Sequence, residues 1–162
     1  MRSTLDLSTI ENASSHEFNN TQLNFTEFNI KRKGARPIRF SGIELAMSMS
    51  FASEIPYWYE INLYKTHDQQ YVSAIRLFHQ SSDLSDTITA QEHSNVESAL
   101  ECITQYDAAQ DVQLPFDYDC SLKNPASLAA SALNLRSRIC ECRIHYQALV
   151  GEFLFDYEMS SA

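Results

Sequence analysis

The sequence predicts an α+β fold, in which an antiparallel meander of three to four strands is followed by two helices, the last one long. Residues 22–79 contain segments in which apolar and polar residues alternate, which is typical of strands. From residue 94 onward the apolar spacing changes to the helical period. The chain has 162 residues, close to the commonest size of one domain. We therefore expect residues 1–20 to form a flexible polar segment and residues 21–162 to form a single domain.

The predicted strands follow one another closely. Residues 22–30 alternate weakly and predict a short strand. A nine-residue period-two segment runs from Ile43 to Phe51, and its phase slips at Ser41-Gly42, where we expect a β-bulge. Residues 57–66 and 70–79 also alternate, and the short linker between them permits only a hairpin.

Two helices are predicted after the strands. The first begins with the capping-box pattern Ser94-Asn95-Val96-Glu97, with Ser94 as N-cap, and should end near Ala109. The second begins at Asn124-Pro125, with Asn as N-cap and Pro in the first helical position.

The last helix carries a long apolar seam with unbroken 4-3 spacing, typical of coiled coils and helical bundles. The seam consists of Leu128, Ala132, Leu135, Ile139, Cys142, Tyr146, Leu149 and Phe153. A helix over residues 125–158 would be roughly 50 Å long, whereas a compact domain of this size is about 40 Å across. The helix should therefore bend, break near Gly151, or project and form a homodimer. The alternative is that the seam packs against the chain's own sheet and first helix.

The charge distribution is the clearest functional clue. The 46 residues between Arg76 and Lys123 contain no Lys or Arg and nine acidic residues, which equals the net charge of −9. Such a local field attracts cationic partners and repels nucleic acid. The expected partner-binding residues are Asp83, Asp86, Glu92, Glu97, Glu101, Asp107 and Asp111. We favour a non-catalytic interaction module, an inhibitor or accessory factor, that binds a basic protein surface. Nucleic-acid mimicry is a stricter version of this hypothesis, and a merely solvated acidic surface is the alternative.

A basic turn suggests a second function, that of a nucleic-acid-binding accessory protein. Its five basic residues are Lys31, Arg32, Lys33, Arg36 and Arg39. They would hold phosphates in a salt-sensitive way, and the aromatic residues Phe40, Trp58 and Tyr64 would stack on single-stranded bases. The same bases could instead neutralise part of the acidic stretch within the chain.

Enzymatic functions are disfavoured by the residue patterns. Cys140 and Cys142 point away from each other on a helix, so Cys142 and His145 alone would not complete a zinc site. Cys102 and Cys120 lie in the acidic stretch, where negative charge disfavours the thiolate that a partnership with His67, His79 or His93 would require. A metal-dependent hydrolase remains a third hypothesis, and its carboxylates would be Glu60, Asp83, Asp86 and Glu92. We expect no cofactor and no metal.

The predicted hairpin resembles one in a group of bacterial proteins. Trp58-Tyr-Glu60-Ile-Asn-Leu-Tyr-Lys-Thr66, followed by Tyr71-Val72, is similar to a W-x-E-x-x-L-Y-x-T…Y-V pattern in small uncharacterised proteins of plasmids and other mobile elements. Those proteins also have a preceding Phe-x-Gly and an Ala-Leu-Val-like run in a long last helix. This chain lacks their glycine after the turn and their more basic last helix. The resemblance implies a bacterial mobile-element setting and carries no activity.

The expected setting of the protein is the cytoplasm. The sequence has no apolar run of 18 residues, and its beginning lacks the apolar stretch of a signal peptide, so we expect no membrane partner.

Overall fold

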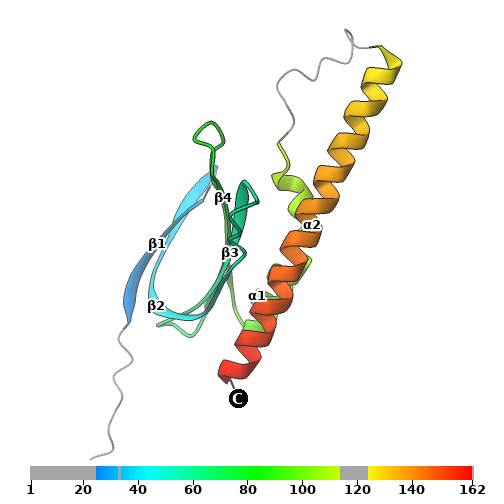
Figure 1. The fold of residues 1–162 in the computed structure, drawn as a ribbon. Coiled ribbons are helices and arrows are strands. Elements are labelled where there is room, and N and C mark those ends of the chain that lie inside the picture. Colours follow the sequence, from blue (N-terminus) through cyan, green and yellow to red (C-terminus); the bar gives the residue numbers. More distant parts are fainter. Residues whose placement is uncertain (1–24, 33, 114–123, 162) are drawn as a thin grey trace, which may run out of the picture.

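The computed structural model describes residues 25–32, 34–113 and 124–161 (Figure 1). Five strands form one antiparallel sheet in the order of the chain. They are β1 (Thr26–Arg32), β2 (Ala35–Met49), β3 (Tyr57–Thr66), β4 (Tyr71–His79) and β5 (Thr87–His93). Helix α1 (Val96–Gln105), the short 3-10 helix η1 (Ala108–Asp111) and the long helix α2 (Pro125–Ser161) follow. The predicted α+β class is confirmed, with one strand more than expected.

Strand β5 was not predicted from the sequence, and the phase slip in β2 lies three residues later than predicted. Strand β5 contains Ile88 as its only large aliphatic residue, so its alternation is weak, and its pairing with β4 defines it. The register of β2 against β3 shifts between Glu44 and Ala46, which makes Leu45 the extra residue. Gly42 serves a different purpose, because a Cβ there would lie 2.5 Å from the carbonyl oxygen of Lys65.

The sheet has an apolar core on each face. One face packs against both helices, with Tyr59, Ile61 and Leu63 of β3 against Tyr146 and Phe153 of α2 and neighbouring residues. The other face is enclosed because the sheet curls and brings β1 near β5 (Figure 1). Inside this curl lie Ile30, Ile38, Tyr64, Val72, Ala74 and Ala90. Two covered faces explain why no residue of β3 or β4 is exposed.

Helix α1 begins one residue later and ends earlier than predicted. Its N-cap is Asn95, whose side-chain oxygen accepts a hydrogen bond of 2.8 Å from the amide of Ser98. The helix ends at Gln105 because Tyr106 adopts an extended conformation. Asp107 then caps η1 by accepting a 3.0 Å hydrogen bond from the amide of Ala109. The chain therefore turns toward β3 before the predicted end of the helix.

Helix α2 is continuous over 37 residues and passes through Gly151 without a break. Asn124 is its N-cap, as predicted, and its side-chain oxygen accepts from the amide of Ser127 at 2.8 Å. In the C-terminal half of the seam, Tyr146, Leu149 and Phe153 are buried against the sheet and α1. The N-terminal half of α2 extends past the end of the sheet (Figure 1). There the seam residues Leu128, Leu135 and Ile139 are only half-buried, and Ala132 is exposed.

None of the helices in the described part of the chain is both long and apolar enough to cross a membrane.

Candidate functional site

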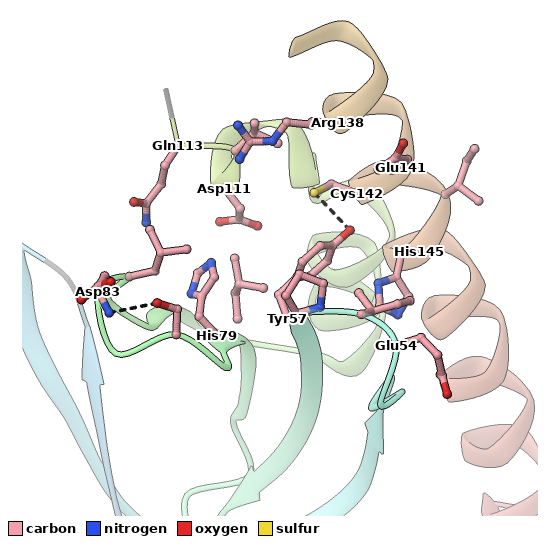
Figure 2. Close-up of a pocket in the computed structure, with 17 residues that line it drawn as sticks. Glu54, Tyr57, His79, Asp83, Asp111, Gln113, Arg138, Glu141, Cys142 and His145 are labelled. Carbon is pink, nitrogen blue, oxygen red and sulfur yellow. Dashed lines mark hydrogen bonds between the residues drawn. The ribbon is translucent and has the colours of Figure 1, made fainter. Parts of the chain in front are cut away.

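A cavity of about 960 Å³ lies between one end of the sheet and α2 (Figure 2). Its walls come from the β2–β3 loop, the end of β4, the β4–β5 loop, η1 and α2. Figure 2 shows His79, Asp83 and Asp111 on one side, and Cys142 and His145 of α2 on the other. The volume falls at the upper end of the range in which proteins bind small ligands or a few side chains.

Asp111 lines the cavity and is held by two tyrosines that lie behind the cavity wall. Its carboxylate accepts a 3.0 Å hydrogen bond from the hydroxyl of Tyr59 and bonds of 2.9 and 2.8 Å from the hydroxyl of Tyr106. Burial raises the pKa of Asp111, and the tyrosine hydrogen bonds oppose that rise. Both tyrosines come from the packed core, so the carboxylate has a fixed position and acts as a preorganised acceptor.

His79 presents a buried ring nitrogen without a partner. Its side chain is only 9% exposed, and its Nδ1 has no hydrogen-bond partner among the described residues. Asp86 accepts a 3.0 Å hydrogen bond from the backbone amide of His79, but its carboxylate is 4.0 Å from Nδ1. Buried polar atoms normally have partners. His79 lines the cavity, but its Nδ1 atom is itself buried.

The α2 side of the cavity combines a second histidine with Tyr57 and Cys142. The His145 Nε2 atom lies 3.2 Å from the carbonyl oxygen of Ser50, which can only accept, so this nitrogen carries the proton. Its Nδ1 has no partner among the described residues. The Cys142 thiol donates to the hydroxyl of Tyr57 at 3.5 Å. Burial raises the pKa of Tyr57 above its ordinary value, so its hydroxyl stays neutral at physiological pH.

The charge of the cavity is acidic. Four carboxylates line it, from Glu54, Asp83, Asp111 and Glu141, together with one guanidinium, from Arg138. Asp83 and Asp111 were predicted from the sequence as binding residues, whereas Glu54 and Glu141 were not. These two lie outside the cation-free stretch, in the β2–β3 loop and in α2. No local pattern marks them, because only the fold brings the three segments together.

The other predicted acidic residues lie outside the cavity. Asp107 forms an ion pair with Arg143 of α2, with N–O distances of 2.8 and 2.7 Å, and Asp86 holds the backbone of His79. Glu92 on β5 and Glu97 and Glu101 on α1 are exposed. The predicted acidic face therefore divides into cavity residues, structural residues and a solvated remainder.

Comparisons with protein families, with curated proteins and with solved structures found no match to this chain. Its function must therefore be inferred from the chemistry of its surfaces. The cavity is lined by four acidic residues and by apolar residues such as Ile55, Leu77 and Ile144, which together suit a cationic group carried on an apolar stem.

The described residues of the basic turn differ in exposure. Lys31, Arg36 and Arg39 are exposed, and Lys33 lies outside the described residues. Arg32 instead donates to the carbonyl oxygens of Arg36, at 2.8 Å, and Ala90, at 3.5 Å.

The aromatic residues expected beside this turn lie in the sheet's interior. Phe40 and Tyr64 pack inside the curl with ring centroids 5.5 Å apart. Trp58 stacks on Phe78 at 5.4 Å. Successive side chains of a strand point to opposite faces, so Arg39 and Phe40 do not share one surface. Nucleic-acid binding by this turn stays a prediction.

The candidate metal and catalytic residues are dispersed. Glu60 forms a 2.8 Å ion pair with Arg76, while Asp86 and Glu92 lie at opposite ends of β5. Within residues 25–32, 34–113 and 124–161, no cluster of three His, Cys, Asp or Glu side chains could hold a metal ion.

Among the described residues, Cys102, Cys140, His67 and His93 lie outside the cavity. Cys140 is exposed, Cys102 and Cys142 are half-buried, and Cys120 lies outside the described residues. His67 lies beside Asp68, and the Nε2 atom of His93 is 2.8 Å from the hydroxyl of Ser73.

Proposed function

We propose that this protein is a non-catalytic interaction module that accepts basic side chains of a partner protein in the cavity beside α2. Four acidic residues and one arginine line this cavity, and this excess of negative charge supports the proposal. The excess of negative charge attracts Lys or Arg side chains and disfavours anionic ligands. The proposal keeps Asp83 and Asp111 of the predicted acidic face and adds Glu54 and Glu141.

Two further features suit a basic side chain on an apolar stem. Asp111 is partly buried and fixed by two tyrosines, so a guanidinium or ammonium group would gain a positioned acceptor without reorganisation of the site. The ring of Tyr57 lies 5.5 Å from that of His145, and such rings contact the methylene groups of Lys or Arg well. Because these acidic residues line one cavity, we propose recognition of individual side chains rather than mimicry of a nucleic-acid backbone. The bacterial mobile-element setting, suggested by the hairpin resemblance, is part of the same proposal.

Fluorescence anisotropy with a labelled peptide of alternating Arg and Phe tests this function. The cavity variant carries Glu54→Gln, Asp83→Asn and Glu141→Gln, and its matched control carries Glu92→Gln, Glu97→Gln and Glu101→Gln. Both remove three negative charges. We expect the cavity variant to bind at least about 10-fold more weakly and the control to lose about 2-fold or less, because long-range attraction is screened but direct contacts are not.

Three outcomes would overturn the proposal. They are equal losses in the two variants, no loss in the cavity variant, and no binding of the peptide by the unchanged protein at low salt. A peptide with Glu in place of Arg serves as the ligand control and should not bind.

A further inference from the structure

Helix α2 carries a second apolar face, which runs its whole length and is exposed. It consists of Ala126, Ala130, Leu133, Ser137, Cys140, Ile144, Ala148, Gly151, Phe155 and Met159, which we call the outer stripe. At about 100° per residue these positions fall within roughly a third of the helix circumference, opposite the buried Tyr146 and Phe153. Every residue of the outer stripe is exposed, and none is charged.

The large residues of the outer stripe are unusually exposed for apolar side chains. Leu133 is 67% exposed, Ile144 68%, Phe155 64% and Met159 67%. Single exposed apolar residues are common, but a continuous row of them on one helix face marks an interaction surface.

Gly151 gives independent evidence that another molecule approaches this face. A glycine inside a helix costs about 1 kcal/mol relative to alanine. A Cβ at Gly151 would meet nothing within 4 Å, so the fold of the single chain does not require glycine there. Small residues on a helix surface allow a second helix to approach closely, and Ala148 lies one turn away in the same stripe. The glycine is explained if a helix packs across this point.

The charges along α2 indicate which helix that is. Residues 125–143 contain Arg136, Arg138, Arg143 and Glu141, with a net charge of +2. Residues 144–161 contain Glu152, Asp156 and Glu158, with a net charge of −3. Two copies of α2 side by side in parallel would repel, whereas an antiparallel pair would place each basic half beside an acidic half.

We infer that α2 pairs antiparallel with α2 of a second copy of this chain, through the outer stripe and about a twofold axis near Gln147. Arg136 and Glu158 are each 11 residues from Gln147 and about 40° apart around the helix. Each Arg136 therefore faces Glu158 of the second copy. The same register sets Ile144 against Gly151, and Phe155 near Cys140, so that large residues meet small ones. The outer stripe shares Ile144 with the cavity wall but contains none of the charged cavity residues used in the proposed function.

A charge exchange tests both the partner and the orientation. Sedimentation equilibrium should give twice the chain mass of 18.5 kDa for the unchanged protein. Arg136→Glu and Glu158→Arg should each weaken the dimer at least about 10-fold, because each places two like-charged pairs across the axis. The double variant Arg136→Glu/Glu158→Arg should restore it. A monomeric unchanged protein, or a double variant weaker than both single variants, would overturn the inference.

Two further variants separate loss of pairing from loss of folding. Ile144→Glu should give a folded monomer, shown by an unchanged circular dichroism spectrum. Phe51→Glu, at a residue 55% exposed outside α2, should leave the dimer intact.

Disulfide cross-linking tests the antiparallel orientation. In a Cys140→Ser background, two copies of the variant Ala148→Cys should form a disulfide with each other through the introduced cysteines under oxidation. Leu133→Cys should form no such disulfide, because about 40 Å would separate the two introduced thiols. Cross-linking through position 133 would contradict the antiparallel orientation.

Discussion

Arg143 of α2 donates two hydrogen bonds to Asp107, with N–O distances of 2.8 and 2.7 Å, and this pair joins the cation-free segment to the last helix. Asp107 also accepts from the amide of Ala109, so one carboxylate both caps η1 and holds α2. The two contacts position Asp111 at the other end of η1 relative to α2. The acidic stretch is therefore partly a structural connection and not only a solvated surface.

The Asp107–Arg143 pair should make folding sensitive to acid. The hydrogen bonds from Arg143 and Ala109 lower the pKa of Asp107 from 3.8 to about 2. A carboxyl with a lowered folded-state pKa contributes stability above its unfolded value and loses it as the pH falls through the folded value. Asp107→Asn should therefore lose stability at pH 6 but show a flatter decline in Tm between pH 4 and pH 2. The effect is small because both side chains are exposed, and an unchanged slope in thermal denaturation would contradict it.

Asp111 should change the pH dependence of folding stability in the opposite direction to Asp107. Burial raises its folded-state pKa, so its ionised form is less favourable in the folded chain than in the unfolded one. The unfavourable contribution is present above the folded pKa and disappears below the unfolded one. Asp111→Asn should therefore increase the Tm relative to the unchanged protein at pH 7. The increase should be smaller at pH 4. A gain in Tm that is larger at pH 4 than at pH 7 would contradict this assignment.

The hydroxyl of Tyr146 should hold α1 to α2. It donates a buried 2.8 Å hydrogen bond to the carbonyl of Ile103, in the last turn of α1, where carbonyls lack helical partners. Tyr146→Phe should lower the free energy of unfolding by about 1–2 kcal/mol, because the buried carbonyl loses its donor. Tyr157→Phe is the control, since its hydroxyl has no hydrogen bond to another described residue. Equal losses for both variants in urea denaturation would show that the bond contributes nothing specific.

Substitutions at Gly151 should affect folding stability and dimer formation differently. Gly151→Ala should raise the free energy of unfolding by about 1 kcal/mol at concentrations where single chains prevail. Gly151→Leu should leave the circular dichroism spectrum unchanged and abolish the dimer in sedimentation, because the larger side chain blocks the approach of a second helix. A stable dimer of Gly151→Leu would place the contact elsewhere.

The sequence predicted the central hairpin well because its periodicity is strong. Strand β3 was predicted with its observed bounds, and β4 to within one residue. Strand β5 was missed because its pairing with β4, rather than its own pattern, makes it a strand. The capping-box pattern pointed to Ser94, yet the neighbouring Asn95 is the N-cap, since either side chain can accept from the first turn.

The two apolar faces of α2 are a second feature whose role could not be predicted from the sequence. The 4-3 spacing of the seam predicted either an internal contact or a homodimer, and nothing in the sequence decided between them. The structure buries Tyr146 and Phe153 within the chain, which leaves the opposite face open. The cavity was also out of reach, because Glu54, Asp111 and Glu141 come from three segments that only the tertiary fold brings together.

The most direct test of the proposed function is an NMR titration of the histidine rings with the Arg-Phe peptide. His79 and His145 line the cavity, whereas His67 and His93 lie outside it and serve as internal controls. We predict that the ring resonances of His79 and His145 shift in a saturable way while those of His67 and His93 stay in place. Shifts at all four rings alike, or at none, would contradict binding of basic side chains in the cavity.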